Sequence, residues 1–253
     1  LEETDRVKIM EELTSYRPDS VSVVIPAFNE HVEIGRCLES LGRQTYQEFE
    51  VIVVDNGSTD DTALIAESFG VRVVTEPRRG IAPARQAGFE AAQGAIIAST
   101  DADTVVPPDW VERIVEAFRE DPETIAVFGP FRYRSDSAPR PFVNRIIPYC
   151  SSGLAVGQRV TWRLGVPHFP GSNFAVRREA FFQVGGFRSP TSGRLYSYWE
   201  DIQLGLKLNR IGEVRYLPDL VVTASARKLR SFRSNVVTPA RKAAALYILG
   251  RDL

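Results

Sequence analysis

The chain has 253 residues, enough for one large domain or two small ones with a substantial hydrophobic core. Its hydrophobic fraction of 43% and charged fraction of 25% are ordinary for a soluble globular protein. The net charge of −1 excludes an overall attraction to nucleic acid or to a membrane surface. The charge is uneven, however, because the segment from Arg210 to the end holds nine basic and three acidic residues.

Two cysteines, Cys37 and Cys150, exclude a framework of several disulfides and fit a reducing compartment. The sequence shows no signal peptide and no apolar run long enough to span a bilayer. It begins at Leu1 rather than at a methionine, so it can be part of a longer protein. We therefore expect a cytoplasmic chain, with any membrane contact confined to the cytoplasmic face.

Apolar β-branched runs and helical patterns alternate four times along the first 120 residues. The first run predicts a strand at Val21–Ile25, ended by Pro26, and a helix that begins at Asn29 or Glu30. The same reasoning predicts further strands at Phe49–Val54, Val71–Thr75 and Ala95–Ala98, and further helices at Ala63–Phe69, from Gly80, and at Pro108–Glu120. This alternation predicts an α/β fold with a doubly wound, mostly parallel central sheet and helices on both faces.

The pattern is less regular after Ile125. Residues 130–170 are rich in proline, arginine and aromatic residues, and no elements are assigned to them. Residues 171–187 predict a short strand, a short helix and a glycine stop, and a further helix is predicted after residue 199. We divide the chain into an arm at 1–20, two halves of one domain at 21–129 and 130–225, and a basic helical tail at 226–253.

Two aspartates, Asp101 and Asp103, follow the predicted strand at Ala95–Ala98. At the carboxyl end of a strand in an open α/β sheet, they would face the crevice where ligands bind. Two carboxylates separated by one small residue can hold Mg²⁺, which takes one or two protein carboxylates together with phosphate oxygens. The competing interpretation is an ordinary acidic turn, because this short pattern is common.

Five motifs together resemble the family 2 glycosyltransferases in order and approximate spacing. They are VVIPAFNE at residues 23–30, VVDNGSTDDT at 53–62, Asp101-Ala-Asp103, Gly185-Gly-Phe187 and Trp199-Glu-Asp201. The resemblance extends from about residue 21 to residue 220. It implies a GT-A fold in which residues 21–129 bind a nucleotide-diphospho-sugar and residues 130–225 form the acceptor side.

The resemblance also implies an inverting transfer that uses Mg²⁺ or Mn²⁺ and a UDP- or GDP-sugar. The divalent ion would stabilise the charge that develops on the departing diphosphate. Asp103 is the expected direct metal ligand, and Asp101 is expected to bind the metal or the ribose. Asp201 matches the family's general base for the acceptor hydroxyl, with Glu200 orienting the acceptor or tuning the base. A purely structural pair of acids at a helix start, favoured by the helix dipole, is the alternative.

For the donor, the resemblance places the loop after the first strand around the nucleotide, with Pro26, Ala27 and Glu30 as the contacting residues. Asp55 matches the position that hydrogen-bonds the base. The competing role for Asp55 is an Asx-turn at the end of a strand.

Further along the chain, Arg85 matches a segment that lies against the nucleotide, where it would offset phosphate charge. An exposed surface arginine is the alternative. Ser172 and Asn173 fall where the family lines the sugar and acceptor site. His168 is assigned to packing or to the acceptor loop rather than to a metal.

Two departures from the family pattern limit the expected metal ligands and the expected number of sugars added. Val105 stands where some members carry a glutamine, so this loop supplies no third metal ligand. No Gln-x-x-Arg-Trp motif follows Asp201, which favours addition of a single sugar over processive synthesis. A sugar-phosphate nucleotidyltransferase and a non-catalytic nucleotide- or carbohydrate-binding module remain as alternatives.

The basic tail has two interpretations. Its arginines and lysines surround an apolar stretch from Ala243 to Leu249, so an amphipathic helix could rest on an anionic membrane and meet a lipid-linked acceptor. In the second interpretation, which we favour, the charges are solvated and the apolar face packs on the domain. The expected partners are therefore a nucleotide-sugar donor and a carbohydrate or lipid-linked acceptor, and not a nucleic acid.

Overall fold

The fold is described from a computed structural model of the chain, over residues 19–134, 153–187 and 200–228. The strands are β1 (Val21–Ala27), β2 (Phe49–Asp55), β3 (Arg72–Thr75), β4 (Ile96–Ser99), β5 (Thr104–Val105), β6 (Thr124–Phe128), β7 (Phe131–Arg134), β8 (Phe174–Arg177), β9 (Glu213–Tyr216) and β10 (Val222–Ser225). The helices are α2 (Ile34–Leu41), α3 (Thr62–Ser68), α4 (Ile81–Ala91), α5 (Trp110–Glu120), α7 (Arg178–Gln183), α8 (Glu200–Leu208) and the 3₁₀ turn η3 (Ala226–Lys228). Residues 153–163 are also helical.

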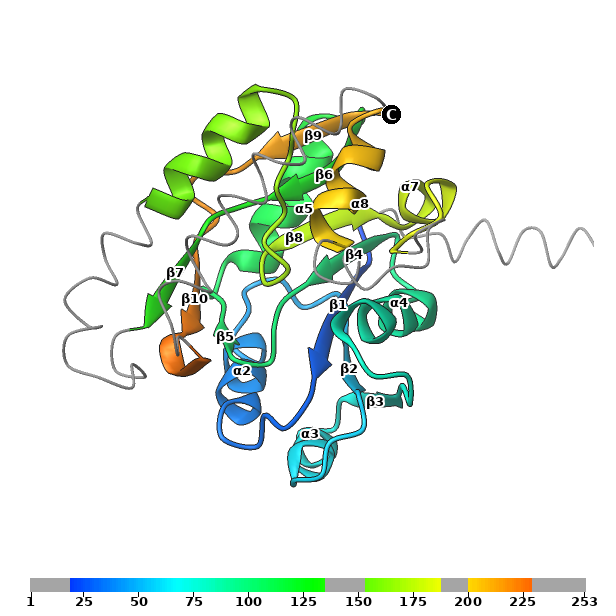
Figure 1. The fold of residues 1–253 in the computed structure, drawn as a ribbon, viewed down its shortest axis with the longest axis vertical. Coiled ribbons are helices and arrows are strands. Elements are labelled where there is room, and N and C mark those ends of the chain that lie inside the picture. Colours follow the sequence, from blue (N-terminus) through cyan, green and yellow to red (C-terminus); the bar gives the residue numbers. More distant parts are fainter. Residues whose placement is uncertain (1–18, 135–152, 188–199, 229–253) are drawn as a thin grey trace, which may run out of the picture.

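The central sheet has seven strands in the order β3-β2-β1-β4-β8-β6-β9, and β5, β10 and β7 form a smaller sheet beside it (Figure 1). β1 pairs in parallel with β2 on one side and with β4 on the other. The chain runs from β1 outward to β2 and then to β3. It then returns, and β4 pairs with the side of β1 that is opposite to β2. The strand order therefore reverses between β1 and β4, which is where open α/β sheets bind ligands, outside the carboxyl ends of the strands.

The predicted doubly wound, mostly parallel sheet is confirmed, with one strand of opposite direction. β8 runs antiparallel to both β4 and β6, while β6 and β9 are parallel. Because Ser99 at the end of β4 pairs with Phe174 at the start of β8, the residues just before β8 lie beside the loop that follows β4.

Helices cover both faces of the sheet. As a result, every residue of β1 is buried. Val23 and Ile25 belong to a core that includes the inner sides of α2 and α5. Val24 points to the other face and packs in a second core with the apolar side chains of α4, α7 and α8. The continuous β-branched run at β1 is the pattern expected of a strand that is buried on both sides.

Gly88 sets how closely α4 approaches the sheet. A Cβ atom at this position would lie 2.3 Å from Val24 Cγ1 and 2.8 Å from Val54 Cγ2. Gly88→Ala should therefore lower the free energy of unfolding by about 1–3 kcal/mol, the usual cost of overpacking a core.

A urea titration followed by circular dichroism measures this change, and Gly35→Ala in α2 is the matched control. No atom lies within 4 Å of a Cβ built at Gly35, so this variant should be neutral or more stable by up to about 1 kcal/mol. Equal stability losses in both variants would contradict the packing explanation.

Two predictions at the first strand were wrong in detail. The strand does not end at Pro26, because β1 continues to Ala27. β1 pairs with β4 only as far as Val24, so Pro26 lies where a neighbour is present on the β2 side alone and a missing N–H is tolerated. The following helix begins at Ile34 rather than at Asn29 or Glu30. Asn29 has a φ of +54°, which a continuing helix cannot accommodate.

Residues 130–170, left unassigned above, contain β7 and the helical residues 153–163. β5, β6, β9 and β10 were also not predicted; they are strands of two to five residues that lie outside the regular alternation of strands and helices. The arm at 1–20 lies outside the described residues except for its last two, and so does the tail beyond Lys228. Over the described residues, no helix has the length and apolar character needed to cross a membrane.

Candidate active site

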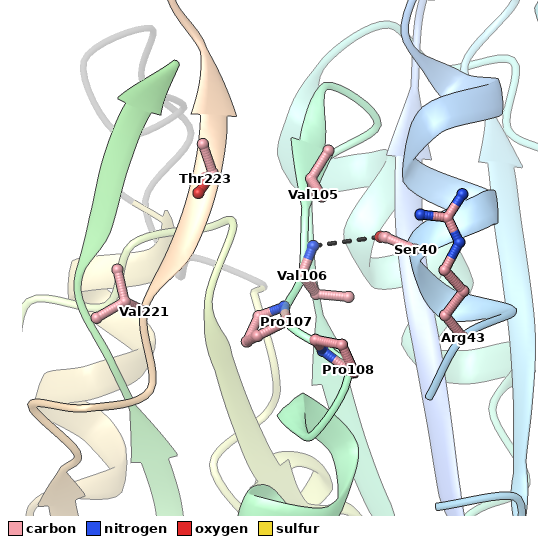
Figure 2. A pocket seen from close by; sticks show the side chains of 8 residues that line it. All are labelled: Ser40, Arg43, Val105, Val106, Pro107, Pro108, Val221 and Thr223. Atoms are coloured by element: carbon pink, nitrogen blue, oxygen red, sulfur yellow. Dashed lines mark hydrogen bonds between the residues drawn. The ribbon is translucent and has the colours of Figure 1, made fainter. Parts of the chain in front are cut away.

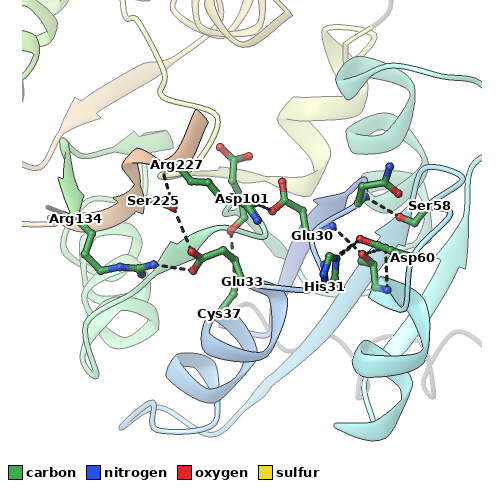
Figure 3. Close-up of polar contacts among 12 residues, drawn as sticks. Glu30, His31, Glu33, Cys37, Ser58, Asp60, Asp101, Arg134, Ser225 and Arg227 are labelled. Atoms are coloured by element: carbon green, nitrogen blue, oxygen red, sulfur yellow. Dashed lines mark hydrogen bonds and ion pairs between the residues drawn. The ribbon is translucent and has the colours of Figure 1, made fainter. Parts of the chain in front are cut away.

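The loops after β1 and β2 are fastened to each other at the carboxyl edge of the sheet. The Thr59 N–H donates to Asn29 Oδ1 at 2.8 Å, and the Asn29 N–H donates to Ser58 Oγ at 3.1 Å. His31 Nδ1 lies 2.6 Å from Asp60 Oδ2 (Figure 3). Burial opposes ionisation of Asp60, but hydrogen bonds from Thr62 and His31 outweigh it and lower the pKa of Asp60 to about 2. The two loops are thus held in fixed positions beside the crevice.

Asp55 is the last residue of β2, and its side chain is buried. The Ser58 N–H, three residues further on, donates to Asp55 Oδ1 at 3.1 Å, a local side-chain bond to the backbone that is related to the Asx-turn of the competing role. This bond uses one of the two carboxylate oxygens, so a second bond to a nucleotide base stays compatible with it. Pro26 and Ala27 lie on the neighbouring strand, where the Ala27 carbonyl accepts a hydrogen bond from the Asn56 N–H at 2.9 Å.

Arg85 occupies the centre of the site. Its Nη1 donates to Glu200 Oε1 at 2.9 Å and its Nη2 donates to Asp101 Oδ1 at 2.8 Å. Its side chain is buried, so the exposed-arginine alternative is wrong. The guanidinium also packs directly on Gly171, where a Cβ atom would lie 1.9 Å from Nη2. The arginine therefore joins the loop after β4 to the first residue of α8.

Two adjacent carboxylates begin α8, and both are difficult to ionise. Burial raises the pKa of Glu200 to about 7, against the opposing effect of Arg85. Burial also raises the pKa of Asp201, while the charges of Arg85 and His168 oppose the rise. A carboxylate whose pKa lies nearer neutrality is a stronger base than an ordinary aspartate. Both carboxylates at the start of α8 are therefore easier to protonate than ordinary acidic side chains.

His168 also belongs to this group. Burial lowers its pKa, and the charge of Asp201 acts in the opposite direction. The sequence reasoning assigned His168 only to packing or to the acceptor loop and did not connect it with Asp201. The two residues are 33 positions apart in the sequence, and no local pattern joins them.

The loop after β4 carries the two aspartates, Asp101 and Asp103, that were predicted to hold a cation. The Asp101 side chain is 34% exposed and keeps one oxygen outside its bond to Arg85. The Asp103 carbonyl accepts a hydrogen bond from the Ser225 N–H at 2.9 Å, which holds the loop against β10. Within the described ranges, no group of three His, Cys, Asp or Glu side chains could hold a metal ion. Two carboxylates suit a Mg²⁺ or Mn²⁺ ion that takes its other ligands from phosphate and water.

Two buried glutamates on the loop between β1 and α2 are each paired with an arginine of the second half of the chain. Arg134 Nη2 lies 2.7 Å from Glu33 Oε2, and Arg227 is ion-paired with Glu30 (Figure 3). Ser225 Oγ adds a 3.3 Å hydrogen bond to Glu33. The Glu30 carboxylate, predicted to contact the nucleotide, is thus engaged inside the protein. Sequence reasoning missed Glu33, Arg134 and Arg227.

Asn173 does not line the site, and its predicted role was wrong. Its side chain is fully buried and its Oδ1 accepts a 2.8 Å hydrogen bond from Trp110 Nε1. Its Nδ2 donates to the Pro130 carbonyl at 2.9 Å and to the Leu220 carbonyl at 2.6 Å. The amide therefore connects α5 with the residues just before β7 and β10. Ser172 is buried beside it.

A hollow of about 310 Å³ lies among the end of α2, β5 with the loop that follows it, and the start of β10 (Figure 2). Its lining is mostly apolar and consists of Ser40, Arg43, Val105, Val106, Pro107, Pro108, Val221 and Thr223. None of the predicted site residues lines it and no carboxylate does, so it is separate from the cluster around Arg85.

Known proteins resemble this chain in sequence and structure. The family model described as Glycosyl transferase family 2 matches residues 22–185. The probable glycosyltransferase YdaM of Bacillus subtilis is 30% identical over 78% of this chain and 49% of its own length. A chondroitin synthase of Pasteurella multocida is 35% identical over 80% of this chain and 20% of its own length. The chain thus spans half or less of these two relatives.

Among solved structures, a mannosyltransferase of Pyrobaculum calidifontis, in complex with GDP-Man and Mn²⁺, superposes with a TM-score of 0.63 at 26% identity. The superposition covers 87% of this chain and 60% of that one. The match of the family model over most of the chain agrees with the reversal of strand order and with the carboxylates gathered beside it. This chain is a member of the family 2 glycosyltransferases, with a GT-A fold.

Proposed function

We propose that the protein transfers one sugar from a UDP- or GDP-sugar to a hydroxyl of a carbohydrate acceptor, with inversion at the anomeric carbon and with Mg²⁺ or Mn²⁺. The single observation that carries this proposal is the bridge by Arg85 between Asp101 and Glu200. This bridge joins the loop after β4, which carries the two candidate metal ligands, to α8, whose second residue Asp201 is the candidate base. The mannosyltransferase named above, which binds GDP-Man and Mn²⁺, supports the choice of donor and metal.

In the proposed reaction, the acceptor oxygen attacks the anomeric carbon from the face opposite the diphosphate. Asp201 takes the hydroxyl proton, the bond between the anomeric carbon and the β-phosphate oxygen breaks, and the nucleoside diphosphate leaves with the bonding electron pair. When bound, the cation supplies Lewis-acid stabilisation of the departing diphosphate. Asp103 would hold it directly, and Asp101, fixed by Arg85, would bind the metal or the ribose.

The two alternative functions are less consistent with the site. A non-catalytic module needs no proton acceptor, whereas Asp201 and Glu200 are kept in an environment that raises their pKa values. A nucleotidyltransferase would need a glycine-rich phosphate loop after the first strand, and residues 26–30 contain no glycine.

A thermal-shift experiment with nucleoside diphosphates and nucleotide sugars, with and without Mn²⁺, tests the donor site. A ligand that binds only the native state should stabilise it by about 2.7 kcal/mol at a hundredfold excess over Kd. Asp103→Asn should remove the part of the shift that requires Mn²⁺, because the direct metal ligand is lost.

The matched control is Asp109→Asn, a half-buried aspartate paired with Arg113 outside the crevice. This variant should keep the full metal-dependent shift. If no nucleotide gives a metal-dependent shift with the native chain, the proposed donor site is wrong.

A further inference from the structure

Among the described residues, the helix formed by residues 153–163, yellow-green at the upper left of Figure 1, contacts the domain through one side. Trp162 Nε1 donates to the Val214 carbonyl of β9 at 2.7 Å, and Tyr216 Oη donates to the Ala155 carbonyl at 3.4 Å. Gln158 is buried on the same side. These contacts determine which side chains face outward.

The outward face is apolar. Val156, Val160 and Leu164 are 63%, 50% and 62% exposed, and the spacing of four residues places them in one stripe. The Leu164 N–H donates to the Val160 carbonyl at 3.1 Å, so the helical geometry extends to this residue. An amphipathic helix of a globular protein normally presents polar residues to water. Here the side that faces away from the core is apolar.

The charged side chains of the helix itself are positive, while Glu213 of β9, next to Val214, is an exposed carboxylate. Arg159 and Arg163 are exposed and lie along one edge of it, and residues 153–165 contain no aspartate or glutamate. Asn209 Nδ2 donates to the Gly165 carbonyl at 3.3 Å, which brings the end of α8 and the exposed Arg210 close to the end of the helix. Apolar side chains with arginines at their edge are the composition of a helix that lies in the interface of an anionic membrane.

We propose that the Val156–Val160–Leu164 face docks on the surface of an anionic lipid bilayer. A second copy of the chain is a poorer occupant. A two-fold contact through this face would bring Arg159 and Arg163 of both copies together, with no acidic side chain on the helix to neutralise them. The surface is distinct from the basic tail at 226–253.

Docking by this helix would bring the acceptor side of the site close to the membrane. This consequence, unlike the docking itself, rests on the proposed function. The segment that follows the helix contains His168 and Gly171, which lie in the site with Asp201 and Arg85. The acceptor side would therefore work close to the bilayer, where a lipid-linked sugar acceptor is located.

Co-sedimentation of the full chain with phosphatidylcholine vesicles, with and without phosphatidylglycerol, tests the docking surface. We expect binding only to the vesicles that contain phosphatidylglycerol, and weaker binding as salt is added. The Arg159→Gln, Arg163→Gln double variant should lower the partition coefficient roughly thirtyfold, the combined effect of two basic residues near an anionic surface. The Val156→Ser, Val160→Ser, Leu164→Ser triple variant should lose binding to a similar or greater degree.

Leu64→Ser is the matched control, because Leu64 is an exposed leucine on α3. It should bind vesicles like the native chain, and all variants should keep the nucleotide-induced thermal shift, since none touches the candidate site. Absence of native binding, or full binding by both helix variants, would overturn the proposal. Light scattering tests the alternative occupant. If the native chain is a dimer that does not bind vesicles, and the triple variant is a monomer, the face is assigned to a second copy instead.

Discussion

Asp201→Asn should lower the turnover of the nucleotide sugar by roughly 10²–10⁴-fold, the usual contribution of a general base, while leaving donor binding unchanged. Asparagine keeps the size of the side chain and its hydrogen bond to the Ile202 N–H, but it cannot accept a proton from the acceptor. Release of nucleoside diphosphate measures the turnover, and isothermal titration calorimetry measures the Kd for the donor.

The same experiment separates Asp201 from its neighbour. Glu200→Gln should retain more activity, because Glu200 contacts Arg85 and orients the helix start rather than taking the proton in the proposed reaction. The native rate should rise with pH as the pair deprotonates, since the pKa of Glu200 is near 7 and that of Asp201 is also raised. Turnover by Asp201→Asn at the native level would show that another residue is the base.

Arg85→Met should destabilise the protein by about 3–5 kcal/mol, the usual loss when one partner of a buried ion pair is removed. Methionine fills much of the volume but leaves Glu200 buried without its counter-ion and Asp101 without its bond. For a chain of this size, the loss corresponds to a fall in Tm of roughly 6–20 °C, measurable by differential scanning calorimetry.

Two comparisons test the physical reason. Arg43→Met removes an exposed i,i+4 pair with Glu39 and should cost at most about 0.5 kcal/mol. The double variant Arg85→Met, Glu200→Gln should be more stable than Arg85→Met alone, because the uncompensated carboxylate is gone. If Glu200→Gln does not raise the stability of the Arg85→Met variant, Arg85 stabilises the fold through packing on Gly171 rather than through charge.

Several features of this protein follow from local sequence alone. The β-branched run at Val21 and the helical spacing after it identify β1 and α2, and the break from Ala98 to Asp101 identifies the carboxyl end of β4. Period and turn chemistry report the conformation of neighbouring residues, so they suffice for the alternating α/β order of the first 120 residues, including the four-residue strands β3 and β4. Asp101 and Asp103 were placed at the ligand edge of the sheet in this way.

The partners of the charged residues were decided by the tertiary structure. Arg85 and Glu200 are 115 positions apart, and Glu30 and Arg227 are 197 apart. Nothing in the local pattern distinguishes Arg85 from a surface arginine, or Asn173 from a residue that lines a sugar site. Their roles depend on which strands meet, because the antiparallel entry of β8 beside β4 brings Gly171 against Arg85 and Asn173 among three other segments. The sequence by itself determined the edge of the sheet where the chemistry lies, and long-range packing decided which side chains are buried and paired there.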